Sequence, residues 1–490
     1  LFLSYPGTAT EVPRIINFTK QQYRADNQNW SLTQGKDRFI YAGNSKGLLV
    51  FDGIHWSTLA LPNQEIVRAV TIDNKGRVFT GGFNEVGYWE KDFWGTWNYV
   101  SLKEKVEDFD KEEIWHFLPT DDGLFFQSFF RIYNFDVENV KQVALPGNIM
   151  FARRIKGRVL IPVIESGLFE YFSNGRVQLV PGGELFNDYR IATILPGPEN
   201  TLLVGTQKNG IYQYRNGRFE LWQEEINQEL RKYQLNRGIR LTNGDYVFGT
   251  IVSGLFITDS LGMIKHHINW ETGLQNNTIL ALMEDEDQQL WVGMDAGIDL
   301  VEINAPLRFF HGKRIGIGAV YSAELFNQKL YIGTNQGVFW KPWPSERGVS
   351  FKLLEKSQGQ VWDLQTFDGQ LVGAHNNGAF VIKDNQLEFL SNHTGSYTTV
   401  SPPNHDDILL QGTYTGIIVL KKNAERKWSY SHNLEDFPVA SRRMIMEPSG
   451  ALWVAHPHWG IFKLKLDSTF EVIKKQVSFN DEKGLSFDSK

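Results

Sequence analysis

The stretch LWVGMDAGIDLVEI (residues 290–303) is typical of a β-strand, a tight turn bounded by glycines, and a second β-strand. Nearly the same pattern occurs in FIYAGNSKGLLVFD (residues 39–52), LLVGTQKNGIYQY (residues 202–214) and LYIGTNQGVFWKPW (residues 330–343). A hairpin that recurs at similar intervals indicates a repeat protein, in which each repeat is one supersecondary unit.

The second glycine of this hairpin sets a register for the whole chain. The equivalent positions lie 36 to 44 residues apart, at Gly47, Gly87, Arg131, Gly167, Gly210, Gly254, Gly297, Gly337, Gly378, Gly416 and Gly460. We expect these turn glycines to adopt the positive φ that a tight hairpin needs. In eight repeats another glycine precedes this position by four or five residues.

Each repeat holds four short apolar runs, as in residues 278–310, and shows no helix-length periodicity. Four antiparallel strands in roughly 42 residues describe one blade of a β-propeller. We therefore predict an all-β fold of tandem β-propellers with four-stranded antiparallel blades. Eleven repeats exceed the usual four to eight blades of one ring. The prediction is a seven-bladed first propeller and a second propeller that is only partly present.

A glycine-rich stretch, APLRFFHGKRIGIGAV (residues 305–320), predicts the junction between the two propellers. We predict an N-terminal lead over residues 1–14, the first propeller over residues 15–313, and a truncated second propeller of about four blades over residues 314–490. The final residues 482–490 are similar to residues 271–279, which lead into the seventh repeat. We therefore expect about three further blades, on the order of 130 residues, beyond this chain.

Composition excludes several classes of function. The net charge of −6 argues against nucleic acid as a partner of this region. The chain has no cysteine, which rules out disulfides and thiolate metal sites. It has no apolar run of 18 residues, so we expect membrane attachment only through missing C-terminal parts. Phosphate-binding and dinucleotide-binding glycine motifs are absent, and we expect no cofactor and no metal centre.

Three stretches carry a family resemblance: residues 15–34 (IINFTKQQYRADNQNWSLTQ), residues 43–56 (GNSKGLLVFDGIHW) and residues 67–89 (VRAVTIDNKGRVFTGGFNEVGYW). They resemble the two-component regulator propeller family, the periplasmic ligand-sensing domains of Bacteroidetes-type hybrid two-component or helix-turn-helix transcriptional regulators. The resemblance implies tandem seven-bladed propellers in the periplasm, anchored to the inner membrane by later segments. It also implies signal transduction that regulates transcription, with an oligosaccharide or other small molecule as the ligand. A homodimer would suit such a regulator.

Propellers bind ligands where the innermost strands begin, at the mouth of the central channel. Counting back from the first glycine of each hairpin places these starts near aromatic and basic residues. The predicted binding residues are Trp30, Arg68, Trp115, His116, Arg190, Arg237, Tyr321, Trp362, Tyr397 and Arg443. Neighbouring positions at the same strand starts are Phe151, Arg153, Arg240, Leu280 and Arg442. Arginine forks and aromatic faces suit an anionic or hydroxylated sugar.

Other interpretations of these residues remain open at this point. The arginines could pair with carboxylates of the next blade, and the aromatic rings could pack between blades. A propeller enzyme, a polysaccharide lyase or glycosidase, would instead bring two or three carboxylates to one channel mouth. A protein-binding scaffold would present an exposed apolar patch. The sensor interpretation predicts no catalytic residues.

Overall fold

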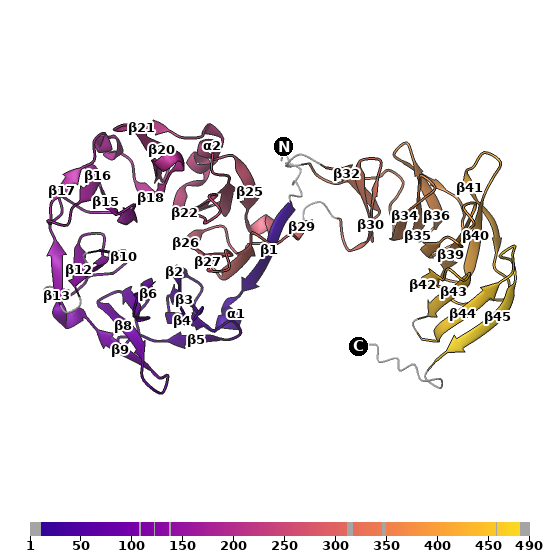
Figure 1. Ribbon diagram of the computed structural model, residues 1–490, viewed down its shortest axis with the longest axis horizontal. Helices are drawn as coiled ribbons and strands as arrows, with labels where there is room; N and C mark the ends of the chain where they lie inside the picture. The colour runs from indigo at the N-terminus through magenta and orange to yellow at the C-terminus, as the bar shows by residue number, and fades with distance from the viewer. Residues whose placement is uncertain are drawn as a thin grey trace, which may run out of the picture. The chain divides into compact units, whose positions relative to one another are not determined.

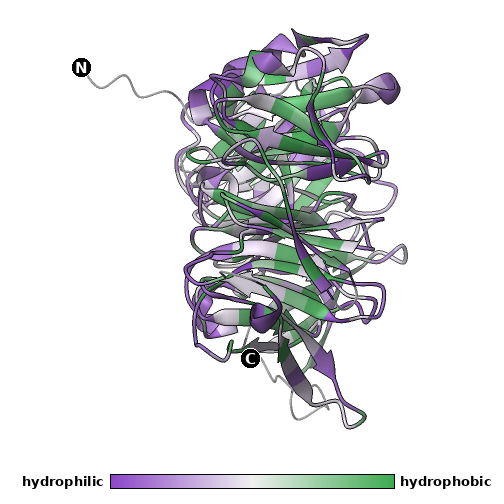
Figure 2. Ribbon diagram, turned by 90° about the vertical axis from the view of Figure 1, so that its left-hand side faces the viewer, coloured by the Kyte–Doolittle hydropathy of each residue, from purple (hydrophilic) through white to green (hydrophobic). Residues whose placement is uncertain are grey.

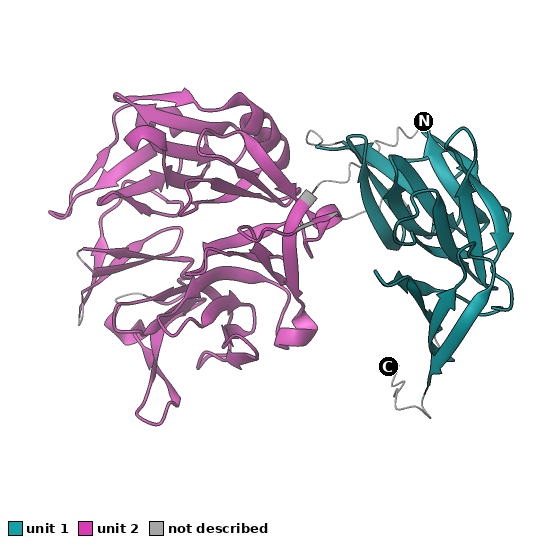
Figure 3. Ribbon diagram, turned by 45° about the vertical axis from the view of Figure 1, so that its right-hand side comes forward, with its two compact units in different colours: residues 1–10, 311–490 teal, residues 11–310 magenta. Residues whose placement is uncertain are grey.

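The computed structural model describes residues 11–106, 109–121, 123–136, 139–310, 317–344, 349–456 and 458–480. Contacts divide the chain into two compact units (Figure 3). The first unit in chain order, magenta and numbered 2 in the key, has residues 11–310 as its described part, apart from short gaps. The second unit, teal and numbered 1 in the key, has residues 317–480 as its described part, again apart from short gaps. The predicted boundaries at 15 and 313 stay a prediction. Four residues of the predicted N-terminal lead lie in the first strand, and residues 311–316 lie outside the described residues.

Seven antiparallel sheets make up the described part of the first unit. Sheet 1 contains β2 (Asn29–Gln34), β3 (Ile40–Asn44), β4 (Gly47–Phe51) and β5 (Trp56–Leu59). Sheet 2 contains β6 (Val67–Ile72), β7 (Val78–Gly82), β8 (Glu85–Lys91) and β9 (Trp97–Ser101). Sheet 3 contains β10 (His116–Thr120), β11 (Gly123–Gln127), β12 (Ile132–Asp136) and β13 (Asn139–Val143). Sheet 4 contains β14 (Arg153–Ile155), β15 (Arg158–Val163), β16 (Gly167–Tyr171) and β17 (Val177–Leu179).

The remaining sheets of this unit follow the same order of strands. Sheet 5 contains β18 (Ile191–Pro196), β19 (Leu202–Thr206), β20 (Gly210–Arg215) and β21 (Arg218–Leu221). Sheet 6 contains β22 (Leu235–Arg240), β23 (Tyr246–Thr250), β24 (Leu255–Thr258) and β25 (Ile264–Ile268). Sheet 7 contains β26 (Ile279–Glu284), β27 (Leu290–Met294), β28 (Ile298–Glu302), β1 (Glu11–Phe18) and β29 (Arg308–Phe310).

The described part of the second unit contains four sheets of the same kind. Sheet 8 contains β30 (Val320–Phe326), β31 (Lys329–Thr334), β32 (Val338–Pro342) and β33 (Lys352–Leu353). Sheet 9 contains β34 (Val361–Phe367), β35 (Gln370–His375), β36 (Gly378–Lys383) and β37 (Gln386–Phe389). Sheet 10 contains β38 (Ser396–Val400), β39 (Ile408–Thr413), β40 (Ile417–Lys422) and β41 (Trp428–Asn433). Sheet 11 contains β42 (Arg443–Met446), β43 (Ala451–His456), β44 (Gly460–Leu466) and β45 (Ile473–Phe479).

The first strands of sheets 1 to 7 contact one another in a closed cycle, in the order β2, β6, β10, β14, β18, β22, β26 and back to β2. In Figure 1 these strands lie toward the centre of the unit, while β9, β13, β17 and β21 lie at its periphery. In the second unit β30, β34, β38 and β42 are successive neighbours in the same way. The predicted all-β propeller class is therefore confirmed. The number of blades in a complete second ring stays a prediction.

Sheet 7 is closed by the N-terminal strand, which the sequence pattern did not reveal. The expectation was that the apolar run at residues 306–310 forms the fourth strand beside the third. Instead β1 pairs antiparallel with β28, with Arg14 opposite Glu302, and β29 lies outside β1. Phe18 then stacks on Trp291 with ring centroids 5.5 Å apart, inside the cluster that joins sheets 7 and 1. The two ends of the first unit are thus held in one sheet.

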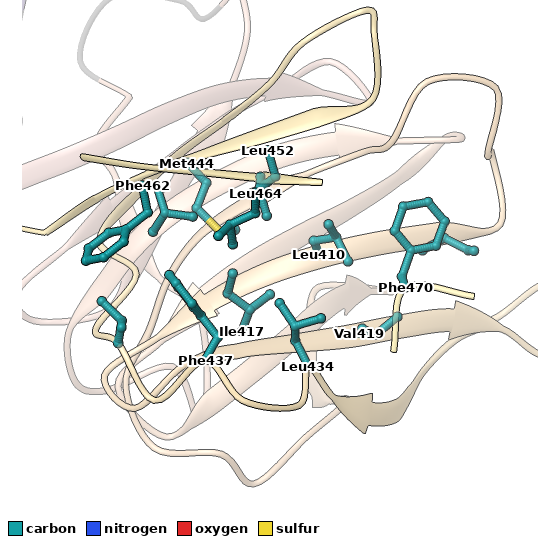
Figure 4. Close-up of a cluster of buried hydrophobic side chains, with 13 residues drawn as sticks. Leu410, Ile417, Val419, Leu434, Phe437, Met444, Leu452, Phe462, Leu464 and Phe470 are labelled. Carbon is teal, nitrogen blue, oxygen red and sulfur yellow. The ribbon is translucent and has the colours of Figure 1, made fainter. Parts of the chain in front are cut away.

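The core consists of apolar layers between adjacent sheets. Middle strands such as β3, β19 and β27 are buried at every position because a neighbouring sheet covers each of their faces. Figure 2 shows these apolar strands joined by polar connecting loops. One such layer, drawn in Figure 4, joins sheets 10 and 11 through side chains that include Leu410, Val419, Leu452 and Leu464. Blade-to-blade burial of this kind stabilises a propeller in place of one central core.

Most of the predicted turn glycines have the expected conformation, as at Gly297 with φ of 91°. The register was wrong in sheet 2, where Gly87 lies inside β8 without a positive φ. The turn there is at Asn84, with φ of 54°, because asparagine tolerates the left-handed region. The repeating first glycine of this sheet is consequently Gly81, which pairs with Ala69 as Gly293 pairs with Ala281.

The first glycine of each hairpin lies where the next sheet begins. A β-carbon on Gly249 would lie 2.5 Å from Ile279 Cγ2, and one on Gly293 would lie 2.8 Å from the backbone oxygen of Asn29. The same close approach joins Gly81 to Ile114 in the first unit and Gly412 to Ser441 in the second. A side chain at this position would therefore push the neighbouring inner strand away.

The helices are short, and none of them was predicted from the sequence. The described residues contain α1 (Lys20–Tyr23), α2 (Glu224–Tyr233) and the 3₁₀ turns η1 (Lys103–Lys105), η2 (Gly183–Phe186), η3 (Pro198–Asn200) and η4 (Trp270–Thr272). In α2 the buried Ile226 and Leu230 pack on sheets 5 and 6, and Asn227 Oδ1 accepts a hydrogen bond from Ile211 N at 2.7 Å. Acidic residues in its first turn and basic residues in its last are the sequence signal that was overlooked.

We expect Gly293→Ala to destabilise the first unit by about 2–3 kcal/mol, because the added methyl group meets a backbone oxygen at the closure between sheets 7 and 1. Urea denaturation measures the change in the free energy of unfolding. Gly76→Ala is the control: its turn has φ of 83° but no atom within 4 Å, so it carries only the backbone cost of about 1 kcal/mol. Equal losses for the two variants would contradict the role assigned to Gly293.

The pairing of β1 with β28, which closes sheet 7, also predicts a pH dependence of stability through Asp299 on β28. Burial raises the pKa of Asp299 to about 6, although Asn17 Nδ2 and Gln275 Nε2 donate hydrogen bonds to its carboxylate at 2.8 and 2.7 Å. A raised pKa means that the folded state binds the proton more tightly than the unfolded state. Its contribution is therefore complete below about pH 4 and is lost as the pH rises through 6, by about 3 kcal/mol at most. Denaturation of the Asp299→Asn variant should lack this slope, and an unchanged slope would refute the assignment.

Candidate functional site

The inner strands share a β-bulge close to their starts. Register shifts in eight sheets leave one residue unpaired in each, namely Trp30, Arg68, Ala192, Asn236, Leu280, Tyr321, Trp362 and Tyr397. A bulge re-aims one side chain and is common at barrel rims and functional sites. Five of the ten predicted site residues occupy such a bulge.

Three of the predicted site residues, Trp30, Arg68 and Trp115, form a compact group in the first unit. The Arg68 guanidinium lies 4.0 Å from the ring centroid of Trp30 and 4.3 Å from that of Trp115. Its Nε donates to Glu113 Oε1 at 2.7 Å. These contacts satisfy the packing interpretation for this group. One donor is left, because Arg68 Nη1 is buried without a hydrogen-bond partner among the described residues.

His116 lies beside this group, on the first residue of β10. Arg153 Nη1, which can only donate, lies 2.7 Å from His116 Nε2, and Ala152 O, which can only accept, lies 3.1 Å from the same nitrogen. Burial lowers the pKa of His116 well below its usual range, and the charges of Arg153 and Arg237 lower that pKa further. His116 is therefore neutral at pH 7, and in the tautomer with its proton on Nδ1 it accepts the shorter hydrogen bond, from Arg153.

Arg237 continues the cluster from sheet 6. Its guanidinium lies 4.7 Å from the Phe151 ring centroid, and its Nε donates to Leu280 O at 2.7 Å. Burial, together with the nearby charges of Arg153 and Arg190, lowers the pKa of Arg237 to about 9. Burial also lowers the pKa of Arg153 to about 10. Both guanidinium groups keep their charge at neutral pH, at a cost in desolvation and mutual repulsion.

A cavity of about 520 Å³ opens beside the arginines, between sheets 3, 4 and 5. Phe129, Ile164 and Tyr189 give it apolar and aromatic walls, and Arg190 lines it as well. Phe129 connects it to the cluster, since its ring stacks on Phe151 with centroids 5.7 Å apart. Its volume is within the usual range for small-molecule sites.

The second unit brings its predicted aromatic residues together in a different way. Tyr321 stacks on Trp362 with ring centroids 4.7 Å apart, and Tyr397 lies 5.5 Å from Trp362. Tyr414 extends the row at 4.7 Å from Tyr397, and its hydroxyl accepts a hydrogen bond from Trp362 Nε1 at 3.3 Å. We call these four residues the aromatic row. They come from three successive sheets and remain partly accessible.

Of the neighbours Arg442 and Arg443, Arg442 is the one that contacts this group. The structure places the Arg442 guanidinium 5.8 Å from the Trp362 ring centroid, whereas Arg443 has no such contact among the described residues. The reason is the register of the inner strands. Ser441 approaches Gly412 as Asn29 approaches Gly293, so the residue equivalent to Trp30 is Arg442.

Sequence reasoning also missed Tyr414, which lies in a turn between β39 and β40.

The register of the inner strands likewise makes Asn236 the bulged residue of sheet 6, and Arg237 follows it. Asn236 Nδ2 donates a hydrogen bond to Ile279 O at 2.7 Å. The pattern of strand starts therefore located the region, but it could not tell which of two adjacent residues faces the centre.

The comparisons with known proteins agree with the fold. The family model described as "Two component regulator propeller" matches residues 273–296, so the resemblance inferred from the sequence is confirmed. The extracellular domain assigned to the hybrid two component system BT3049 from B. thetaiotaomicron matches with a TM-score of 0.66 and 17% identity, over 97% of this chain and 67% of that chain. No curated protein matches the chain by sequence.

Two other solved structures are more distant. The extracellular domain assigned to the one component system BT4673 from B. thetaiotaomicron has 16% identity and a TM-score of 0.49, over 95% of this chain and 73% of that chain. A catalytically inactive virginiamycin B lyase from Staphylococcus aureus has 12% identity and a TM-score of 0.45, over 59% of this chain and 98% of that chain. Neither of these two matches is close enough to support a functional argument.

The described residues contain neither a membrane-spanning helix nor a cluster of metal-binding side chains. No helix in this part of the chain is long and apolar enough to cross a membrane. Within the same residues, no group of three or more acidic or histidine side chains is placed to hold a metal ion.

The Arg68 group predicts that removing the acidic partner of a partly buried arginine costs more stability than removing the partner of an exposed one. Glu113→Gln leaves a guanidinium that is only 18% exposed without its ion pair, so we expect a loss of about 1–2 kcal/mol in the free energy of unfolding. Glu199→Gln is the matched control, because the Glu199–Arg215 pair is 76% and 54% exposed and contributes less than about 0.5 kcal/mol. Urea denaturation of both variants tests this, and a neutral Glu113→Gln would show that Trp30 and Trp115 alone hold Arg68.

Proposed function

We propose that the chain is the ligand-sensing part of a signalling regulator of the two-component type, located outside the cytoplasmic membrane. Its ligand is an oligosaccharide or a similar small molecule. The observation that carries this proposal is the aromatic row, four partly accessible rings in contact across three sheets, of which Tyr321 and Trp362 are stacked and the others are tilted. Aromatic faces of this kind suit the apolar faces of sugar rings.

The comparison with known structures supports the sensor role. The fold extends along 97% of the chain in the extracellular domain assigned to BT3049, so the whole arrangement of repeats is matched and not one blade alone. That protein is a hybrid two component system by description, and we transfer to this chain the role of its extracellular domain. The periplasmic location and the regulation of transcription are part of the same proposal.

The carboxylates near the inner strands favour binding over catalysis. Glu113 is occupied by Arg68. Asp363, on β34, has a pKa raised by burial, and its oxygens accept hydrogen bonds from Gln365 Nε2 at 2.7 Å and from the backbone nitrogens of Leu364 and Thr399. A glycosidase needs a pair of carboxylates free to act on one bond. These two residues instead have structural partners, in different units.

Signalling requires that the ligand bind one arrangement of the protein more tightly than another. A ligand with equal affinity for both arrangements shifts nothing. A site assembled from several sheets suits this requirement, because a bound sugar would contact strands of more than one sheet. The aromatic row spans sheets 8, 9 and 10.

Thermal-shift and calorimetric titration of the 490-residue chain with neutral and acidic oligosaccharides tests the function. A sensor ligand should stabilise the protein by about 2.7 kcal/mol at a hundredfold excess over its dissociation constant. Trp362→Ala should weaken binding about five- to tenfold through loss of stacking. Trp94→Ala, at an 85% exposed turn between β8 and β9, is the control and should bind normally.

Two outcomes would count against this function. Steady conversion of the sugar, followed by chromatography, would make the chain an enzyme. Absence of binding across the panel would favour a protein partner.

A further inference from the structure

The first unit contains a cluster of cations that the aromatic row does not use. Arg153, Arg190 and Arg237 belong to three successive sheets, and the charges of Arg153 and Arg190 both act on Arg237. Their recorded hydrogen-bond acceptors are His116 and backbone oxygens. Among the residues that the structure describes, no carboxylate forms an ion pair with any of the three.

Arg153 and Arg237 are partly buried, so a missing counter-charge is costly there for the free protein, whereas Arg190 is exposed. Several other arginines of the unit do have acidic partners, as in the pairs Arg158–Glu170 at 2.7 Å and Arg77–Asp73 at 2.8 Å. An anion that enters would regain the lost solvation through charge-assisted, bidentate hydrogen bonds.

The cavity beside the cluster has room for the uncharged part of an anionic ligand. Arg190 belongs to both the cavity wall and the cation cluster. The cavity also presents aromatic Phe129 and Tyr189, polar Asn187, and the carboxylates of Glu165 and Asp188, which can accept hydrogen bonds from sugar hydroxyls. About 520 Å³ accommodates a short oligosaccharide, and this mixture of rings and polar groups is typical of a sugar site.

We infer that Arg153, Arg190 and Arg237 bind the anionic groups of an acidic oligosaccharide whose sugar rings occupy the adjoining cavity. The inference rests on the proposed sensor function and goes beyond it, because it assigns to the first unit a second site, for acidic sugars, that is separate from the aromatic row. A carboxylate and a sulfate present the same chemistry to a guanidinium, so both uronic acids and sulfated sugars belong to this class. Three cations suit a ligand with two or more negative charges. His116 acts as a positioning residue that holds Arg153 in place.

Calorimetric titration of the full chain with trigalacturonate, a sulfated glucuronate-containing disaccharide, neutral maltotriose and inorganic sulfate tests the inference. We expect at least one of the acidic sugars to bind, and that affinity should fall as salt is added. Arg237→Gln and Arg153→Gln should each weaken it about 10- to 100-fold. Arg240→Gln is the matched control, because it removes the same charge from the same strand. Arg240 lies over the Tyr246 ring, at 5.6 Å, and is not part of the cation cluster, so this variant should bind normally.

The melting temperature without ligand separates a binding role from a structural one. If the cluster is a binding site, Arg237→Gln should melt at the wild-type temperature or above it, because one of three repelling charges is gone. A lower melting temperature would show that Arg237 serves the fold and would overturn the inference.

Other outcomes also decide the matter. Binding of maltotriose alone, lost in Trp362→Ala and kept in Arg237→Gln, would leave the sensor function standing and refute the acidic ligand. Sulfate binding as tightly as either sugar would refute the role of the cavity. Absence of binding by every probe would count against both proposals.

Discussion

The close approach between a glycine of one sheet and the inner strand of the next is the constraint on which the rest of the structure depends. At Gly43, Gly249, Gly293 and Gly412 there is no room for a β-carbon against the neighbouring strand. The contact sets how closely successive sheets pack, and so how their inner strands meet. It also sets the register, because the residue after each contact is the one that takes the bulged or equivalent position, such as Trp30 or Arg442.

The same scaffold carries two different chemistries. In the first unit the strand starts supply arginines and a neutral histidine, and in the second they supply stacked aromatic rings. Backbone geometry is alike in the two units, so the difference comes from side chains that the fold leaves free to vary. An array of this kind can change its ligand without changing its fold, since the glycine contacts fix the backbone at the strand starts and leave the side chain that follows each contact free to vary.

Much of the fold could be predicted from sequence because a blade is a local object. The recurring glycine hairpin and the four apolar runs predicted the β-propeller class correctly. The failures have physical reasons: Asn84 replaced a turn glycine and shifted one register, and α2 is too short to dominate a repeat pattern. Candidate residues such as Trp362 and Tyr397 were found at their bulges. Tyr414 was missed because it reaches the aromatic row from a turn.

The sequence by itself determined the repeat, the all-β class and the region where strand starts gather, because each follows from contacts within about 40 residues. Tertiary structure alone decided which residues share a site. Arg68 meets Glu113 across 45 positions, and Arg14 meets Glu302 across 288. It also decided that Arg68 is neutralised while Arg153 and Arg237 are not. Charge pairing depends on which side chains the closed cycle of sheets brings within a few ångströms, and no local pattern records that distance.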